Sequence, residues 1–62
     1  MINKYVIVVK NAKWGTEYFY RGFASKEWAK EIAKDLQSNN EDKIMVMDIE
    51  IAHKRHVKNL PD

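Results

Sequence analysis

Residues 17–36, with the sequence EYFYRGFASKEWAKEIAKDL, decide the fold of this chain. The first part of this stretch, over residues 17–22, is rich in aromatic side chains, which suit the pleated surface of a strand. Ser25 is a good helix N-cap, because its hydroxyl can accept a hydrogen bond from a free backbone N–H of the first turn. The stretch therefore predicts a strand, a sharp corner and a helix over about residues 26–37.

The predicted helix has one apolar face. Its apolar residues recur at the spacing that places side chains on one side of a helix. They are Trp28, Ala29, Ile32, Ala33 and Leu36. We expect this face to pack against a sheet as core, where the small alanines allow a close approach.

Two further strands flank this unit. Residues 4–10 contain a continuous apolar run, which is typical of a central strand buried on both faces. Residues 43–51 alternate instead, and we predict that Met45, Met47, Ile49 and Ile51 face the helix. The segment between the first two strands contains asparagine and glycine, which favour the turn of a hairpin.

The order of these elements predicts an α+β fold. We expect a single ββαβ domain over residues 1–62, with a three-stranded mixed or antiparallel sheet and one helix packed on one face. Residues 52–62 are predicted either to prolong the last strand or to form a basic C-terminal arm.

The length of the chain bears on its stability. A chain of 62 residues buries only about 60% of its unfolded surface and commonly needs a disulfide, a metal or a partner subunit. The sequence has no cysteine and no cluster with the spacing of a zinc site. We therefore predict a homo-oligomer, and the alternative is a small monomer held by its tryptophans and its helix.

One helix can cover only one face of a three-stranded sheet. Because aromatic and apolar side chains are left for the second face, we predict that this face contacts a second copy or another protein. Trp14 is expected either to fold over the sheet edge or to be an exposed anchor. The predicted contact residues are Tyr5, Trp14, Tyr18, Tyr20, Ile44 and Val46.

The charge distribution offers an alternative function, the binding of DNA or RNA. The formal net charge of +2 and the isoelectric point of about 9.0 are only mildly basic. Basic side chains would contact phosphates, and Trp14, Tyr18 or Tyr20 would stack on bases. Asp48 and Glu50 argue against one continuous basic surface. The residues predicted for this alternative are Lys10, Lys13, Arg21, Lys54, Arg55 and Lys58.

Residues with catalytic or metal-binding chemistry form no recognised motif. His53 and His56 would point to opposite faces of a strand, and a zinc site needs three or four ligands. Asp48 and Glu50 share one strand face, but a small sheet has little volume for the pocket that paired acids require. The chain also lacks a glycine-rich phosphate loop. We therefore predict no enzyme, no cofactor and no metal.

The apolar run over residues 5–9 is too short to be a signal peptide or a membrane span. The absence of cysteine fits a reducing compartment. The sequence therefore predicts a soluble, cytoplasmic protein without a membrane partner.

Residues 21–29, RGFASKEWA, resemble short parts of two known families. They are similar to the sheet-to-helix corner of the arm-binding domains of tyrosine integrases, which read DNA with a three-stranded sheet. They are also similar to one half of a peptidoglycan-binding SPOR domain. Each resemblance covers nine residues, and no binding residue is assigned from either family.

Small, cysteine-free chains rich in lysine, asparagine and isoleucine resemble the accessory proteins of phages and other mobile elements. This resemblance implies an anti-defence role or the inhibition of a host enzyme. The sequence thus predicts a small, non-enzymatic interaction protein that self-associates and that inhibits or modulates another macromolecule.

Overall fold

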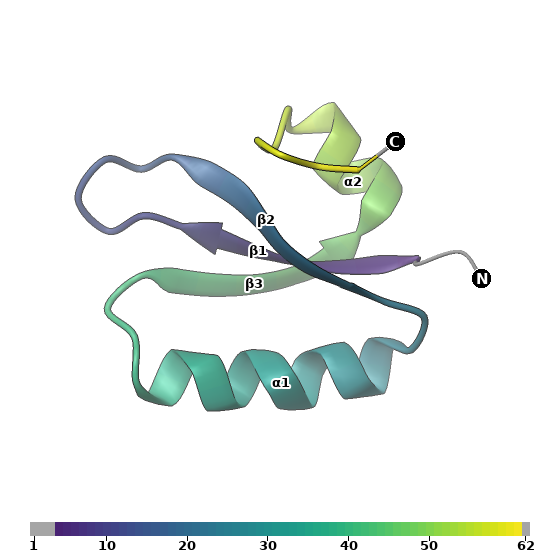
Figure 1. The fold of residues 1–62 in the computed structure, drawn as a ribbon, viewed down its shortest axis with the longest axis horizontal. Helices are drawn as coiled ribbons and strands as arrows, with labels where there is room; N and C mark the ends of the chain where they lie inside the picture. Colours follow the sequence, from purple (N-terminus) through teal and green to yellow (C-terminus); the bar gives the residue numbers. More distant parts are fainter. Residues whose placement is uncertain (1–3, 62) are drawn as a thin grey trace.

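The computed structural model describes residues 4–61 as an antiparallel three-stranded sheet with a helix on each side (Figure 1). Its elements, in chain order, are β1 (Tyr5–Lys10), β2 (Glu17–Phe23), α1 (Lys26–Ser38), β3 (Lys43–Asp48) and α2 (Ile49–Lys54). The strand order across the sheet is β2-β1-β3. The predicted α+β fold, with a three-stranded sheet and a helix on one face, is confirmed. The ends of the predicted domain, residues 1–3 and 62, lie outside the described residues.

β1 is the central strand, as predicted. Val6, Ile7, Val8 and Val9 are all buried. Val6 and Val8 belong to one cluster of buried residues, whereas Ile7 belongs to the other. Because successive side chains of a strand point to opposite faces, each face of β1 requires its own cover.

The connection between β1 and β2 is a tight turn. The Asn11 Oδ1 atom accepts hydrogen bonds from the N–H groups of Lys13 at 2.9 Å and Trp14 at 2.8 Å. The N–H of Gly15 donates to the Asn11 carbonyl at 2.8 Å. Gly15 has a φ of 73°, a left-handed conformation that glycine adopts at little cost. The predicted hairpin turn is confirmed.

α1 begins at the predicted cap, where the N–H of Trp28 donates to Ser25 Oγ at 3.3 Å. Ala29 and Ala33 are buried against the sheet. Trp28, which we predicted to be core, is 58% exposed, and its ring centroid lies 6.4 Å from that of Phe23. The prediction was wrong because successive residues of a helix are rotated by about 100° around its axis, so Trp28 and Ala29 point in different directions. Trp28 therefore lies at the margin of the face that Ala29 and Ala33 occupy.

β2 contains a β-bulge that reverses its alternation. Ile7 pairs with Arg21, but Val8 pairs with Phe19, so one residue of β2 has no partner in the register. Strict alternation would place Phe19 and Phe23 on the same face. Because the bulge inserts one residue between them, Phe23 packs into the cluster beneath α1 and Phe19 packs against the cluster beneath α2.

The two faces of β3 are assigned the opposite way from our prediction. Ile44 and Val46 pack against the cluster beneath α1, whereas Met45 and Met47 pack against the cluster beneath α2. Alternation identifies which side chains share a face. Since both faces of this sheet are apolar and covered, the alternation gives no signal for which face meets α1.

β3 ends at Asp48, so the strand predicted over residues 43–51 is too long. Asp48 is the N-cap of α2, and its Oδ1 atom accepts the N–H of Glu50 at 3.3 Å. Acidic Glu50 in the first turn and basic Lys54 in the last turn both suit the helix dipole. The alternation of apolar residues continues through this helix, which is why the pattern alone predicted a longer strand.

The end of α2 directs the chain back onto the sheet. His56 has a φ of 56°, and its N–H donates to the His53 carbonyl at 3.1 Å. The N–H of Val57 donates to the Ala52 carbonyl at 3.2 Å. This is the hydrogen-bond pattern of a Schellman motif, which also brings the residue after the turn into apolar contact with the last helical turn. Val57 and Ala52 accordingly belong to the same buried cluster.

α2 and the residues after it cover the second face of the sheet (Figure 1). Ala52 and Val57 are buried together with Val6 and Val8. The partly buried residues packed against this cluster are Phe19, Met45, Met47, Ile49 and Leu60. The predicted C-terminal arm over residues 52–62 is thus part of the packed fold as far as Leu60, and Asp62 lies outside the described residues. The prediction of an uncovered second face was therefore wrong.

The contribution of this second cover can be tested with Val57→Ala. Removing a buried valine side chain from a packed cluster should lower the free energy of unfolding by roughly 1–3 kcal/mol. Urea denaturation followed by circular dichroism measures this change. Ile51→Ala is the matched control, because Ile51 is half exposed and should change the stability by less than about 1 kcal/mol. Equal stability of V57A and the wild type would indicate a C-terminal segment that does not support the sheet.

Candidate functional site

The outer edge of β3 is open. At the opposite edge of the sheet, the N–H of Phe19 donates to the Lys58 carbonyl at 2.8 Å, and the N–H of Lys58 donates to the Glu17 carbonyl at 3.1 Å. Within residues 4–61, no strand pairs with β3 on the side away from β1. An open edge presents backbone groups that can hydrogen-bond to an added strand.

Alternate residues of β3 direct their backbone groups toward this open side. The N–H of Ile49 donates to the Lys4 carbonyl at 2.8 Å. In the antiparallel register, every second residue of β3, counted back from Ile49, therefore forms backbone hydrogen bonds with β1. Ile44, Val46 and Asp48 are the residues between, so their N–H and C=O groups point away from β1.

Two of these outward groups are already used by the fold. The N–H of Ile44 donates to Gln37 Oε1 at 2.9 Å. The carbonyl of Asp48 accepts the first hydrogen bond of α2, as the carbonyl of an N-cap residue does. The other outward groups have no hydrogen-bond partner among the described residues: both groups of Val46, the carbonyl of Ile44 and the N–H of Asp48. The edge thus offers paired donors and acceptors over a short length.

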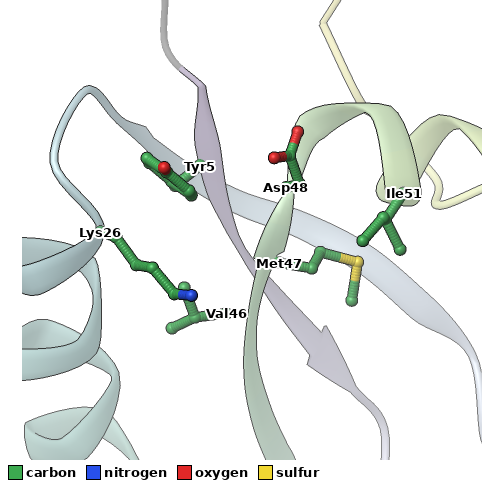
Figure 2. Close-up of a pocket in the computed structure, with 6 residues that line it drawn as sticks. All are labelled: Tyr5, Lys26, Val46, Met47, Asp48 and Ile51. Atoms are coloured by element: carbon green, nitrogen blue, oxygen red, sulfur yellow. The ribbon is translucent and has the colours of Figure 1, made fainter.

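A pocket of about 280 Å³ lies beside this edge (Figure 2). It is lined by Tyr5, Lys26, Val46, Met47, Asp48 and Ile51. The pocket surrounds the end of β3, because Val46 belongs to the packing beneath α1 and Met47 to the packing beneath α2. Ile51 is 50% exposed and adds an apolar side chain from α2. The pocket can therefore receive an apolar side chain of a strand bound to the edge.

Lys26 brings a positive charge to the same edge. Figure 2 shows its side chain extending from the start of α1 toward Val46. The amide of Gln37, near the other end of α1, bonds to Ile44 of β3. The side of α1 that holds both residues therefore lies along the open edge. Lys30 is on this same side, because it follows Lys26 by four residues and precedes Gln37 by seven.

A second group of charged residues surrounds Glu17. The Arg55 Nε atom donates to Glu17 Oε1 at 3.1 Å, and Arg55 Nη2 forms an ion pair with Oε2. Lys10 lies opposite Glu17 in the register of β1 and β2. Lys58 is hydrogen-bonded to the backbone of Glu17. This carboxylate thus lies among basic residues from β1 and from the C-terminal segment.

The hydrogen bonds from Arg55 hold the pKa of Glu17 below its ordinary value of 4.5. Partial burial of the carboxylate acts in the opposite direction, and the charges of Arg55 and Lys10 lower the pKa further. The same pairing raises the pKa of Arg55. Glu17 therefore stays ionised and ties β2 to the segment that covers the second face of the sheet.

The structure distributes the predicted contact residues over both edges of the sheet. Tyr5 and Val46 line the pocket at the open edge. Ile44 packs against the cluster beneath α1 and contributes a backbone carbonyl to the same edge. Tyr18 and Tyr20 lie in β2, at the opposite edge. Half of this predicted set thus meets at β3.

Trp14, the remaining predicted contact residue, lies in the hairpin turn. It is 75% exposed, so it does not fold over the sheet. The Lys13 Nζ atom lies 5.3 Å from the centroid of its ring, a cation–π contact. Of the two alternatives for Trp14, the structure therefore shows the exposed position.

The residues predicted for nucleic-acid binding are brought together in part. Lys10, Arg55 and Lys58 surround Glu17, and Lys54 precedes Arg55 at the end of α2. Lys13 lies in the adjoining hairpin turn. Arg21 lies apart, on the face covered by α1, where its guanidinium carbon is 5.1 Å from the centroid of the Phe23 ring. The acidic residues Asp48 and Glu50 lie at the far end of β1 from Lys10.

Lys26, Met47, Asp48 and Ile51 line the pocket but were not predicted as site residues. One signal in the sequence could have found part of this set. Asp48 is a strong N-cap residue followed by Glu50 and then by basic residues, which is a typical helix pattern. The meeting of α1 with the end of β3, which adds Lys26, is set by tertiary packing alone.

Two further observations concern the described part of the chain. Within residues 4–61, no group of three or more His, Cys, Asp or Glu side chains is placed to hold a metal ion. Neither α1 nor α2 is long and apolar enough to cross a membrane.

Comparisons of this chain with protein-family models, with curated proteins and with solved structures found no match.

The role of the Glu17–Arg55 pair can be tested with Glu17→Gln. A carboxylate whose pKa is lowered by folding stabilises the fold above its unfolded pKa, and this stability is lost as the pH falls through the folded pKa. We therefore expect the wild type to lose its stability advantage over E17Q as the pH falls below about 4.5. Urea unfolding of both proteins between about pH 7 and pH 3 measures this difference. A difference that does not change with pH would contradict the assignment.

Proposed function

We propose that this chain is a small, non-enzymatic interaction protein that binds another protein at the open edge of β3. The observation that carries this proposal is the set of unpaired backbone groups on Ile44, Val46 and Asp48 next to a partly apolar pocket. In strand addition, main-chain hydrogen bonds provide affinity and pockets for alternate side chains provide specificity. The edge of β3 offers both features.

The activity predicted from the sequence is retained, but we place the contact at an edge of the sheet and not on one of its faces. The predicted contact face is covered by α2 and the residues after it, so the contact shifts to the edge of the sheet. Tyr5 and Val46 remain contact residues because they line the pocket. Homo-oligomerisation, expected from the length of the chain, stays a prediction.

The proposed consequence of binding is inhibition or modulation of the partner. A segment of the partner that is held as an added strand is no longer available for its own contacts. The resemblance of this small, cysteine-free chain to accessory proteins of phages and mobile elements supports a host enzyme or a defence protein as the target.

Ile51→Glu tests the contact at the edge of β3. The substitution removes an exposed apolar side chain from the pocket. Ile51 is half exposed and glutamate is a good helix former, so α2 should be retained. We expect a purified partner to bind I51E about tenfold more weakly than the wild type. Nuclease-treated extract of the producing cells, passed over immobilised wild type, supplies partners for this titration.

Trp14→Glu is the matched control, because it also replaces an exposed apolar residue with glutamate but lies in the hairpin turn. It should leave the affinity unchanged. A partner that is lost with W14E and retained with I51E would place the contact away from β3 and contradict the proposal.

One observation favours a second candidate, the binding of single-stranded nucleic acid. Lys10, Lys13, Lys58 and exposed Trp14 lie on the hairpin side of the fold, away from the acidic start of α2. Positive side chains beside an exposed aromatic ring suit phosphates and a stacked base. Arg55 is largely engaged by Glu17, which lowers the positive charge available for phosphates.

The double variant Lys13→Glu with Lys58→Glu tests this second candidate. If these lysines contact phosphates, the affinity for a labelled single-stranded oligonucleotide should fall. The slope of log affinity against log salt should also become shallower by about 0.7 for each lost phosphate contact. Fluorescence anisotropy over a salt series measures both. Lys26→Glu with Lys30→Glu carries the same charge change, and an equal effect in this control would rule out a specific site at the hairpin.

A further inference from the structure

We propose that the segment that binds at the open edge of β3 is an extended, acidic stretch of another protein, with acidic and apolar residues in alternation. This inference rests on the function proposed above and specifies the chemistry of the partner. The charges that α1 places along the edge and the apolar side chains of Met47 and Ile51 support it.

The side chains of an added strand would alternate between two different environments. On one side they would meet α1, whose edge-facing side carries Lys26 and Lys30. On the other side they would meet Met47 and Ile51, which line the pocket with apolar atoms. Successive residues of a strand point to opposite faces. Acidic residues therefore suit the positions toward α1, and apolar residues suit the positions between them.

Negative charges mark the end of the edge at which α2 begins. Asp48 is the N-cap of α2, and its carboxylate accepts the N–H of Glu50. Glu50 adds a second negative charge in the first turn of α2. An acidic side chain at this end of the edge would approach these like charges. An apolar side chain directed toward α2 would instead meet Met47 and Ile51.

A second copy of this chain fits the same edge poorly. A two-fold axis at Val46 would match the free backbone groups of two β3 strands. However, both copies of α1 would then lie on the same face of the joined sheet, with their edge-facing sides toward each other. Lys30 of each copy would face its counterpart, and Lys26 would approach the same row of lysines. Because like charges repel and an acidic strand removes this repulsion, charge complementarity favours the acidic partner.

Three labelled peptides with blocked ends provide the test. In the first, valine alternates with glutamate; in the second, with glutamine; in the third, with lysine. Fluorescence anisotropy with the full-length protein should show the tightest binding for the glutamate peptide, and this preference should weaken as salt is added. Methylation of the peptide backbone nitrogens removes hydrogen-bond donors. When the methylated nitrogens lie on the peptide edge that pairs with β3, binding should be abolished. When they lie on the other edge, binding should be retained.

Charge reversal on α1 tests which protein residues read the acidic side chains. Lys26→Glu with Lys30→Glu should weaken binding of the glutamate peptide by about tenfold or more and strengthen binding of the lysine peptide. Both residues are exposed and lie in the first half of α1, so the fold should be retained. The matched control is Lys13→Glu with Lys54→Glu, which has the same change of net charge away from the edge. It should alter the affinity by no more than about twofold.

Amide hydrogen exchange separates failure of this inference from failure of the proposed function. Bound peptide should slow exchange of the Val46 and Asp48 amides, which are the unpaired donors of the edge. Equal binding of glutamate and glutamine peptides, with protection of these amides, would overturn the acidic partner and leave the β3 edge as the contact. A dimer mass, with protection of the same amides in the absence of peptide, would instead identify a second copy as the occupant. Absence of binding and protection with every peptide would overturn this inference, and the I51E titration would then decide the proposed function separately.

Discussion

The burial of β1 on both faces is the constraint on which the rest of the structure depends. Val6 and Val8 face one side of the sheet and Ile7 faces the other. Burial of such a side chain stabilises a protein by roughly 1.5–3 kcal/mol, and the net stability of a domain is only about 5–15 kcal/mol. A short chain therefore gains much from covering both faces. α1 provides one cover, and α2 with the segment as far as Leu60 provides the other.

The position of the open edge follows from these two covers. With β1 in the centre, β2 and β3 are both edge strands. The C-terminal segment that covers the second face also pairs with the beginning of β2 through Lys58. Among residues 4–61, the ends of α1 and α2 satisfy only the N–H of Ile44 and the carbonyl of Asp48 at the other edge. The sequence predicted a contact on one face of the sheet. Because both faces are covered, we propose the contact at an edge of the sheet.

The charged residues of the chain fall into two groups. Some stabilise the fold, and others lie beside the edge at which we propose a partner binds. Arg55, a candidate for phosphate contact in the sequence, forms an ion pair with Glu17 that fastens the second cover to β2. Lys26, which no sequence motif singled out, lies at the pocket beside β3. Exposed charges thus acquire their roles from the neighbours that the fold supplies, and the type of residue alone does not assign them.

The sequence by itself determined the three strands, the central place of β1, the hairpin turn at Asn11 and Gly15, and the helix that begins after Ser25. These features follow from local propensity, capping and short-range periodicity, which act between residues near one another in the chain. Only the tertiary structure decided which face of β3 meets α1 and where the bulge in β2 separates Phe19 from Phe23. It also decided that the last residues of the described chain cover the second face. The physical reason is that both faces of the sheet are apolar, so the alternating pattern is equally satisfied by either assignment. The short helix after Asp48 is stable through the contacts of Ala52 and Val57 with distant β1, which no local window of sequence contains.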